Sequence, residues 1–321
     1  MRQYLASNMP DKNGVLTISG KDFKYLSQVL RLDYGEEIWV RFPDEKLVKM
    51  VVGKIQSKQI ILNPCSEPSC DEKENPADKE ACEANAEENI EANKLKLGET
   101  EYWVFQFVPM HAQLDLIIRQ CVECGIAKIV PVIGTRSPRL GKQAIEAKAQ
   151  RFDRLVKEAR QQSGSPVNTQ IFKPMSLESA LKLWSDANEN CVDAISELQN
   201  TAEKNDAQDK KILKSDIVSA EKNISVNSVA FVLHEADIAD KSLFEHASSA
   251  LKSSKGKIKK VALAVGPEGG MTNEEVSSFK EAGFKLIHFE TNVLRCETAC
   301  LYGIAAIQST FTEYKSWQKS E

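Results

Sequence analysis

The stretch that decides the fold runs from Val261 to Gln308 and reads VALAVGPEGGMTNEEVSSFKEAGFKLIHFETNVLRCETACLYGIAAIQ. It contains two short apolar runs, Val261–Val265 and Lys285–Phe289, and each run leads through a polar loop into a helical pattern. Short apolar runs that alternate with helical patterns predict parallel strands joined by crossover helices. Ligands bind at the carboxyl ends of such strands. We therefore expect the two loops to be neighbours in one site.

The two loops differ in chemistry. The first, Gly266–Gly270, reads GPEGG, and its glycines let backbone amides approach a ligand closely. It matches neither the P-loop nor the G-x-G-x-x-G pattern, and a glycine-rich turn alone is more often an ordinary tight turn. In the second loop, Arg295, Glu297 and Thr298 begin an otherwise apolar helix, where packing needs no charge and free amides bind polar ligands. Together the loops predict a binding site.

Length and composition indicate a globular protein of two domains. The chain has 321 residues, of which 42% are hydrophobic and 27% are charged. It has no apolar run of membrane-spanning length, and residues 1–14 lack the apolar core of a signal peptide, so we expect a cytoplasmic protein. Residues 66–101 hold 12 acidic and 4 basic residues, and without them the net charge of −4 becomes +4. A modestly basic body is compatible with an RNA partner but does not demonstrate one.

The eight cysteines are scattered, as expected of reduced thiols in a cytoplasmic protein. Cys121 and Cys124 form a C-x-x-C motif late in an amphipathic helix, with no second pair after them. Small buried thiols therefore fit better than a redox or zinc site. The four histidines lack metal-ligand spacing, and we expect no metal.

Residues 1–64 are expected to form a small β-rich domain. The runs Glu37–Arg41, Leu47–Ile55 and Gln59–Leu62 are rich in β-branched residues and predict strands, and Lys21–Leu30 predicts one short helix. Small barrels of this kind often bind nucleic acid, although a fold alone does not prove a function. Residues 65–101 have almost no large apolar side chain, which predicts a solvated acidic insertion or linker.

Residues 102–321 alternate between strand and helix patterns, which predicts an α/β domain with a parallel sheet and a polar insertion at about 186–227. In the helix of the opening stretch, Thr272 and Glu275 have the spacing of a capping box, and Gly283 ends the helix. The other expected strands are Tyr102–Phe107, Ala127–Val132, Thr169–Phe172 and Val229–Leu233. The other expected helices are His111–Cys124, Lys142–Gln162, Leu177–Trp184, Lys241–Leu251 and Glu297–Phe311.

The paired loops resemble those of the RsmE family, the 16S ribosomal RNA uridine-N3 methyltransferases of the SPOUT superfamily. The resemblance rests on GPEGG at 266–270 and on the pattern L-R-x-E-T-A at 294–299. It extends to MRQY at 1–4, VLR at 29–31, GE at 35–36, ECGI at 123–126 with IVP at 129–131, and EA at 158–159 with QSG at 162–164. Apart from the two polar insertions, it covers most of the chain in the right order.

Four positions depart from the family pattern. Lys24 and Tyr25 replace a histidine pair, Gln106 stands near the place of a basic residue, and Ser165 replaces an arginine. These three differences bear on RNA contacts. Phe289 and Glu290 stand in the place of a Leu-Gly pair, which bears on the cofactor pocket.

The resemblance implies an N-terminal PUA-like β-barrel that binds RNA and a C-terminal SPOUT domain whose parallel sheet contains a deep trefoil knot. It also implies a homodimer with its site at the subunit interface, S-adenosylmethionine as the cofactor, and 16S RNA of the small ribosomal subunit as the substrate. The residues that it assigns to the cofactor pocket are Leu233, His234, Gly266, Glu268, Gly269, Leu294, Thr298 and Ala299.

Methylation at uridine N3 needs an in-line nucleophile and removal of the N3 proton, but no metal. We expect Arg295 to stabilise the charge that develops on the uracil oxygens, and Glu297 or Glu268 to accept the proton. Alternatively, Arg295 and Glu297 form a structural ion pair or cap. Arg2, Arg31, Arg136 and Arg139 are candidate phosphate contacts or solvated surface charges.

Two other functions fit the same pattern. The chain is alternatively a SPOUT methyltransferase of another RNA, which modifies tRNA or a ribose 2′-hydroxyl. The second alternative is a ribosome-binding factor that has kept the fold and lost the enzymatic activity. The intact loops at 266–270 and 294–299 favour an enzyme, since a binding module has no need of them.

Overall fold

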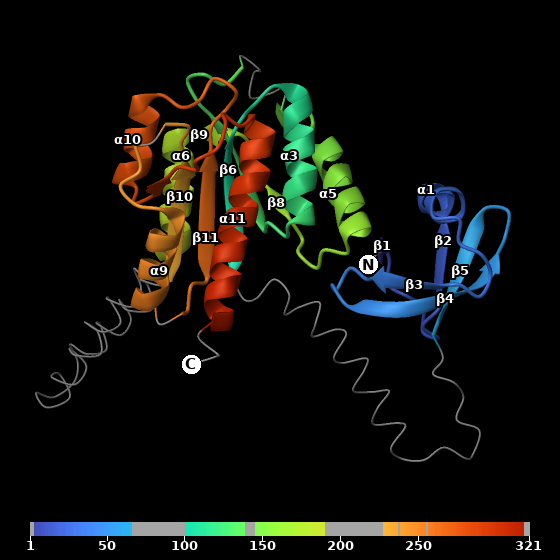
Figure 1. Ribbon diagram of the computed structural model, residues 1–321. Helices are drawn as coiled ribbons and strands as arrows, with labels where there is room; N and C mark the ends of the chain where they lie inside the picture. Colours follow the sequence, from blue (N-terminus) through green and yellow to red (C-terminus); the bar gives the residue numbers. More distant parts are fainter. Residues whose placement is uncertain are drawn as a thin grey trace, which may run out of the picture. The chain divides into compact units, whose positions relative to one another are not determined.

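The computed structural model describes residues 3–65, 100–138, 145–189, 227–236, 238–254 and 256–317 (Figure 1). The chain divides into two compact units, one made of Met1–Gly98 with Lys157–Pro166 and the other of Glu99–Val156 with Val167–Glu321. Most of the expected insertions, 65–101 and 186–227, lies outside the described residues. In the described part of the chain we find no helix that combines the length and apolar character of a membrane span.

The first unit contains a five-stranded sheet in the order β1-β3-β4-β5-β2, in which β1 lies parallel to β3 and the other pairs are antiparallel. The expected strands at 37–41, 47–55 and 59–62 are confirmed, the last of them extended by two residues. The pattern missed β1 and β2, which are short and pair with distant partners. The bounds are β1 Gln3–Leu5, β2 Leu16–Ser19, β3 Glu37–Arg41, β4 Leu47–Ile55 and β5 Gln59–Pro64.

The predicted helix Lys21–Leu30 is present but changes its hydrogen bonding midway. It begins as α1 (Gly20–Lys24) and continues as a π-helical turn, η1 (Tyr25–Val29). The amide of Leu30 donates to the carbonyl of Tyr25 at 3.0 Å, an i to i−5 bond. Arg31 follows with φ of 56°, a left-handed conformation that ends the helix and leaves its side chain exposed.

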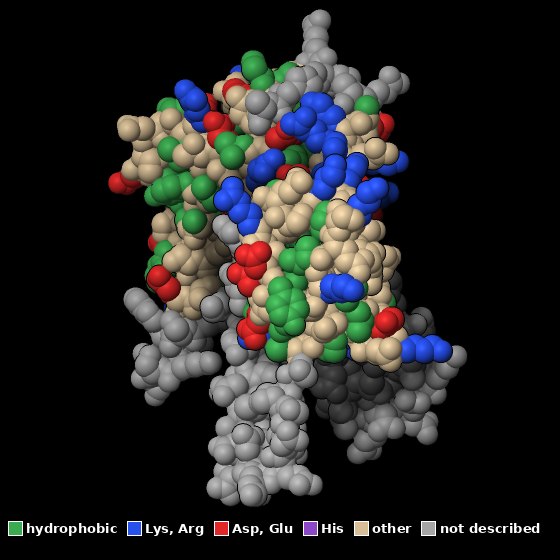
Figure 2. All heavy atoms as spheres, turned by 90° about the vertical axis from the view of Figure 1, so that its right-hand side faces the viewer, with side chains coloured by type: hydrophobic (Ala, Val, Ile, Leu, Met, Phe, Trp, Pro, Cys, Tyr) green, Lys and Arg blue, Asp and Glu red, His purple; other side chains and the backbone are tan. Residues whose placement is uncertain are grey.

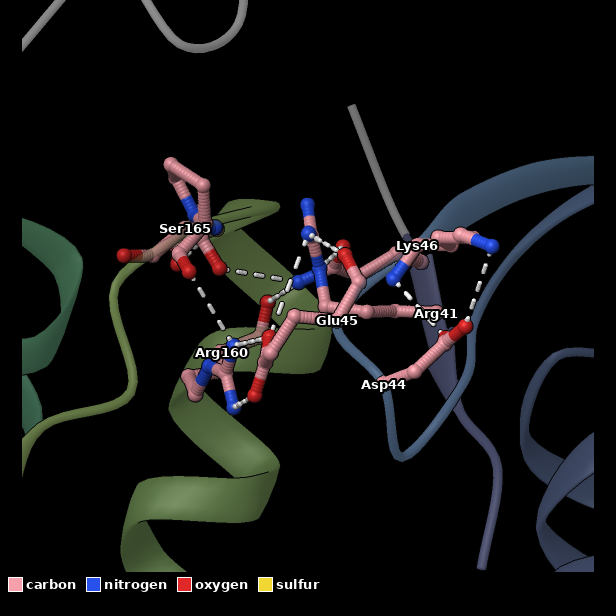
Figure 3. A network of polar contacts seen from close by, with 9 residues as sticks. Arg41, Asp44, Glu45, Lys46, Arg160 and Ser165 are labelled. Carbon is pink, nitrogen blue, oxygen red and sulfur yellow. Dashed lines mark hydrogen bonds and ion pairs between the residues drawn. The ribbon is translucent and has the colours of Figure 1, made fainter. Parts of the chain in front are cut away.

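A buried polar network joins the strands of the first unit to the end of helix α5 (Ala149–Ser163) (Figure 3). The Gln3 amide donates to the carbonyl oxygens of Arg160 and Ser165 at 3.1 and 3.0 Å and accepts from Arg41 Nε at 3.0 Å. Arg160 Nη2 and Glu45 Oε2 lie 2.7 Å apart. Burial and the nearby charge of Arg160 lower the pKa of Arg41. Two buried guanidinium groups therefore share Glu45 as their carboxylate.

The second unit contains a fully parallel sheet in the order β12-β10-β11-β6-β7-β8, with β9 paired to β7. This arrangement confirms the predicted α/β fold with a parallel sheet. Strand β12 ends two residues earlier than expected, so His288 and Phe289 belong to the following loop. The bounds are β6 Glu101–Phe107, β7 Lys128–Ile133, β8 Gln170–Ile171, β9 Met175–Ser176, β10 Ser228–Leu233, β11 Lys260–Val265 and β12 Lys285–Ile287.

Helices pack on the sheet of the second unit, and the two faces differ (Figure 1). Helices α6 (Leu177–Glu189) and α10 (Asn273–Glu281) join an aromatic core that contains Trp103, Phe105 and Phe107, alternate residues of β6. Helix α11 (Cys296–Trp317) packs against β11 and lies beside α3 (His111–Glu123) and α9 (Leu243–Ser253).

One expected helix is interrupted. The prediction of a continuous helix over Lys142–Gln162 is wrong at its start, because a turn separates residues 145–146 from α5, while 142–144 lie outside the described residues. The carbonyl of Lys148 accepts from the amides of Arg151 and Phe152 at 2.8 and 3.0 Å and begins the helix there. Ile145 before the turn and Phe152 after it are both buried, at 2% and 5% exposure.

The cysteines of the C-x-x-C motif lie against helix α11. Cys121 is buried, as predicted, with its Sγ 4.0 Å from that of Cys300, and Cys124 is half-buried. The hydrogen bond with Cys300 and burial raise the pKa of Cys121 well above its usual range. The thiol is therefore protonated at neutral pH and acts as a small apolar side chain.

We expect Glu45→Gln to lower the free energy of unfolding by about 2 kcal/mol, because it leaves two buried arginines without a carboxylate. The cost is smaller than for a fully buried pair, since the Glu45 side chain is 45% exposed. Urea unfolding measures the effect.

Asp44→Asn is the matched control and should cost less than about 0.5 kcal/mol, because among the described residues Asp44 forms an ion pair only with the exposed Lys46, at 3.5 Å. Equal unfolding midpoints for the two variants would show that the network contributes nothing to stability.

Candidate functional site

The carboxyl ends of β10, β11 and β12 meet at one edge of the sheet and surround a cavity of about 420 Å³. The predicted neighbourhood of the two loops is therefore confirmed. The cavity is lined by Gln113, Leu233, His234, Glu235, Val265, Gly266, Pro267, Glu268, Gly270, Met271, His288, Phe289, Thr291, Asn292, Val293, Leu294, Arg295, Cys296, Glu297 and Ala299.

Six of the eight residues predicted to bind the cofactor line this cavity. They are Leu233, His234, Gly266, Glu268, Leu294 and Ala299. Gly269 and Thr298 do not line it, and both are exposed. The roles of all eight residues stay predictions.

The GPEGG loop is a tight turn closed by its own backbone. The amide of Gly270 donates to the carbonyl of Pro267 at 2.9 Å, and Gly270 has φ of 70°. A Cβ at this position would lie 3.1 Å from Oε1 of Glu235. The left-handed backbone favours glycine at 270, and the nearby carboxylate leaves little room for a side chain.

Two histidines join the loops after β10 and β12. The amide of His234 donates to the carbonyl of Ile287 at 3.0 Å, and Nδ1 of His288 lies 3.1 Å from the carbonyl of His234. Nδ1 of His234 lies 3.1 Å from the amide nitrogen of Ala236 and 3.4 Å from its carbonyl oxygen. Sequence reasoning missed His288, since its strand pattern placed it inside β12.

The charged residues of the second loop keep their side chains at the cavity. Arg295 is exposed, and in the described part of the chain it forms no salt bridge. The alternative of a structural ion pair between Arg295 and Glu297 is therefore not formed. The backbone carbonyl of Arg295 accepts from the amide of Ala299 at 2.7 Å, where α11 begins. The guanidinium group is thus free to bind a ligand.

The two candidate proton acceptors are held differently. Oε1 of Glu268 accepts from the amide of Met110 at 2.8 Å, just before helix α3. Oε2 of Glu297 accepts from the thiol of Cys296 at 3.3 Å. Burial and this hydrogen bond raise the pKa of Cys296 to about 12, so the thiol stays protonated and donates. Within the part of the chain that the structure describes, the other oxygen of each carboxylate accepts no hydrogen bond.

Of the four arginines predicted to contact phosphate, the structure describes Arg31 and Arg136, and Arg2 and Arg139 lie outside the described residues. Arg136 is exposed, and its Nη1 donates to the carbonyl of Gly269 at 2.7 Å. The described residues contain no group of three or more His, Cys, Asp or Glu that would hold a metal ion.

The chain is similar to several known proteins. Among curated relatives, the chain is 22% identical to Ribosomal RNA small subunit methyltransferase E 2 of Borreliella burgdorferi, over 94% of each chain. It is 27% identical to Ribosomal RNA small subunit methyltransferase E of Aquifex aeolicus, over 66% of this chain and 70% of the relative.

A solved Ribosomal RNA small subunit methyltransferase E from Neisseria gonorrhoeae, bound to S-adenosyl methionine, has the same fold, with a TM-score of 0.60 and 19% identity over 96% of this chain and 97% of that one. A putative methyltransferase from Legionella pneumophila, in complex with the cofactor SAM, also has a TM-score of 0.60, with 17% identity over 96% of each chain.

The model of the RNA methyltransferase domain family matches residues 97–226 and 212–308, which is more than half of the chain and includes both loops of the cavity. The chain therefore belongs to the RNA methyltransferase domain family, and its resemblance to the RsmE family is confirmed.

Proposed function

We propose that this protein is an S-adenosylmethionine-dependent methyltransferase that modifies N3 of a uridine in 16S RNA of the small ribosomal subunit. The observation that carries the proposal is the cavity at the carboxyl ends of β10, β11 and β12, which both motif loops line. Family membership supports the reaction class, and the names of the curated relatives support the ribosomal substrate.

The cavity fits a cofactor of this size and chemistry. Its volume of about 420 Å³ lies within the range of small-molecule sites. Gly266 and Gly270 expose backbone at its wall, and Oε1 of Gln113 is a buried acceptor without a partner among the described residues. We assign Leu233, His234, Gly266, Glu268, Leu294 and Ala299 to the cofactor contacts, and we keep Gly269 and Thr298, which adjoin lining residues in the sequence, in the same proposed pocket.

The cofactor supplies a sulfonium methyl group. The role of this chain is to hold the uracil ring in line with that group, to remove the N3 proton and to stabilise the negative charge on the uracil oxygens. Arg295 has the free guanidinium for the last task. Glu297 is our preferred proton acceptor over Glu268, because the exposed Glu268 already holds the backbone before α3.

Substrate binding would use both units. We propose that the five-stranded sheet of residues 1–64 is a PUA-like RNA-binding domain, with Arg31 in contact with phosphate, and that residues 102–321 form the knotted catalytic domain. Figure 2 shows exposed Lys and Arg side chains on the face that it draws, as binding of a polyanionic partner requires. We assign the same role to Arg136, Arg2 and Arg139, and a cytoplasmic location to the protein.

We also propose a homodimer. Helices α3 and α11 lie beside each other and expose Leu116 at 43% and Tyr302 at 45%. Val293, in the loop that lines the cavity, is 83% exposed. Large apolar side chains that are exposed around a site indicate an interface, here with a second copy of this chain.

The test uses purified protein, labelled S-adenosylmethionine and three RNA substrates in parallel: unmodified small ribosomal subunits, free 16S RNA and tRNA. We expect label in 3-methyluridine of the ribosomal RNA. Label in tRNA or in a ribose would reject the proposed substrate, whereas the proposed reaction class, methyl transfer to RNA, would still hold. Absence of label with every substrate, together with cofactor binding, would identify a binding factor instead of an enzyme.

Arg295→Ala should lower kcat by about 10²- to 10³-fold, because the charge on the uracil oxygens loses its stabilising cation. The Kd for S-adenosylmethionine, measured by calorimetry, should change less than about threefold. Arg295→Lys is the matched variant and should recover part of the rate, since it keeps the charge without the planar fork. A normal kcat for Arg295→Ala would reject the role.

Glu297→Gln should lower kcat by about 10²- to 10⁴-fold, because it removes the proton acceptor. The Gln carbonyl still accepts from Cys296, so the loop keeps that bond. Glu268→Gln is the matched comparison: its carbonyl still accepts from the Met110 amide, and because Glu268 is assigned to the cofactor contacts, its effect should fall on the Kd for S-adenosylmethionine and not on kcat. If Glu268→Gln is the more damaging change to kcat, the assignment must be reversed.

A further inference from the structure

A short turn after β7 lies against the cofactor loop. Within the turn, the amide of Gly134 donates to Oγ of Ser137 at 3.1 Å, and the amide of Ser137 donates to the carbonyl of Gly134 at 3.2 Å. A Cβ at Gly134 would overlap the ring of Phe107 and lie 2.7 Å from Oε1 of Glu275. Only glycine allows the turn to approach this carboxylate.

Glu275 connects this turn to the helix that follows the GPEGG loop. Its Oε1 accepts from the amide of Thr135 at 2.7 Å, across 140 positions of sequence, and its Oε2 accepts from the amide of Thr272 at 2.8 Å. Glu275 is 7% exposed and does not line the cavity. Both carboxylate oxygens are thus used by backbone donors that would otherwise be left without a partner.

Arg136, from the same turn, holds the loop at a second point. Its Nη1 donates to the carbonyl of Gly269 at 2.7 Å and lies 3.5 Å from that of Met271. The end of the GPEGG loop is therefore attached to the turn twice, through Arg136 at Gly269 and through Glu275 at Thr272. Between them lies Gly270, which faces the cavity.

We propose that Glu275 is a positioning residue for the cofactor loop and that it acts together with Arg136. Neither residue needs to touch the cofactor, because each one positions the backbone around Gly270, which lines the cavity. The inference rests on the proposed function. It goes further because it assigns part of the cofactor affinity to the contact between the turn after β7 and the GPEGG loop. The two sequence motifs of the cavity do not include that turn.

Glu275→Gln is the decisive variant. A Gln side chain has one acceptor oxygen, whereas the amides of Thr135 and Thr272 require two, so one amide would face the Gln NH₂ group. We expect the Kd for S-adenosylmethionine to rise about tenfold as the loop shifts. At saturating cofactor, kcat should fall less than about threefold, since Arg295 and Glu297 belong to the other loop.

The chain offers a matched control in helix α9. Ser242 and Glu245 form the same capping box there, with the amide of Ser242 donating to Oε2 of Glu245 at 2.9 Å and the amide of Glu245 donating to Oγ of Ser242 at 3.2 Å. Glu245 is exposed, and its recorded hydrogen bonds stay within its own capping box. Glu245→Gln therefore removes a cap without moving the cofactor loop.

The experiment is calorimetric titration of the full chain with S-adenosylmethionine in the absence of RNA, together with Tm, for the wild type, Glu275→Gln, Glu245→Gln and Arg136→Ala. We expect weaker binding for Glu275→Gln and Arg136→Ala and wild-type binding for Glu245→Gln. Arg136→Ala changes an exposed side chain and serves if Glu275→Gln does not fold. RNA-free conditions exclude any effect of a phosphate contact at Arg136.

If the wild type does not bind S-adenosylmethionine, the proposed function fails. If the wild type binds and both Glu275→Gln and Arg136→Ala bind within about twofold of it, only the positioning inference is overturned. If Glu245→Gln weakens binding as much as Glu275→Gln does, the effect is one of helix stability and the inference is likewise wrong.

Discussion

The site depends on the parallel pairing of β10 with a strand on each side. Leu233, the last residue of β10, pairs with Val265 of β11 and with Ile287 of β12, so all three strands end at one level. Each following loop must leave from that edge, and the amide of His234 continues the pairing by donating to the carbonyl of Ile287. Backbone register, set by apolar strands, therefore brings together loops that are far apart in sequence.

Much of this arrangement is predictable from the sequence, because β10, β11 and β6 are apolar runs with turn signals at their ends. The capping box of Thr272 and Glu275 is also visible, since it is local. What is not visible is the second use of Glu275, whose other oxygen binds the amide of Thr135. Spacing along one helix gives no information on a partner 140 positions away.

Buried polar residues are the other part that the sequence conceals. The run EARQQS at 158–163 has the composition of an exposed helix end, yet Arg160 and Gln161 are 5% and 4% exposed. Gln3 is 2% exposed and interrupts the apolar pattern of β1, which is why that strand was missed. Each such residue is buried because a specific distant group satisfies it, and periodicity takes no account of partners.

Some charged side chains near the cavity already form hydrogen bonds within the described part of the fold, and others do not. Both oxygens of Glu275 are bound to backbone amides, and Arg136 donates to the carbonyl of Gly269, so these two residues shape the first loop. Arg295 has no salt bridge among the described residues, and it stands on the second loop. The proposed role of Arg295 uses this exposure, because a side chain that lies at the cavity and forms no salt bridge is accessible to a ligand. The first loop is thus held through its backbone, whereas the charge that we propose for catalysis stands on the second loop.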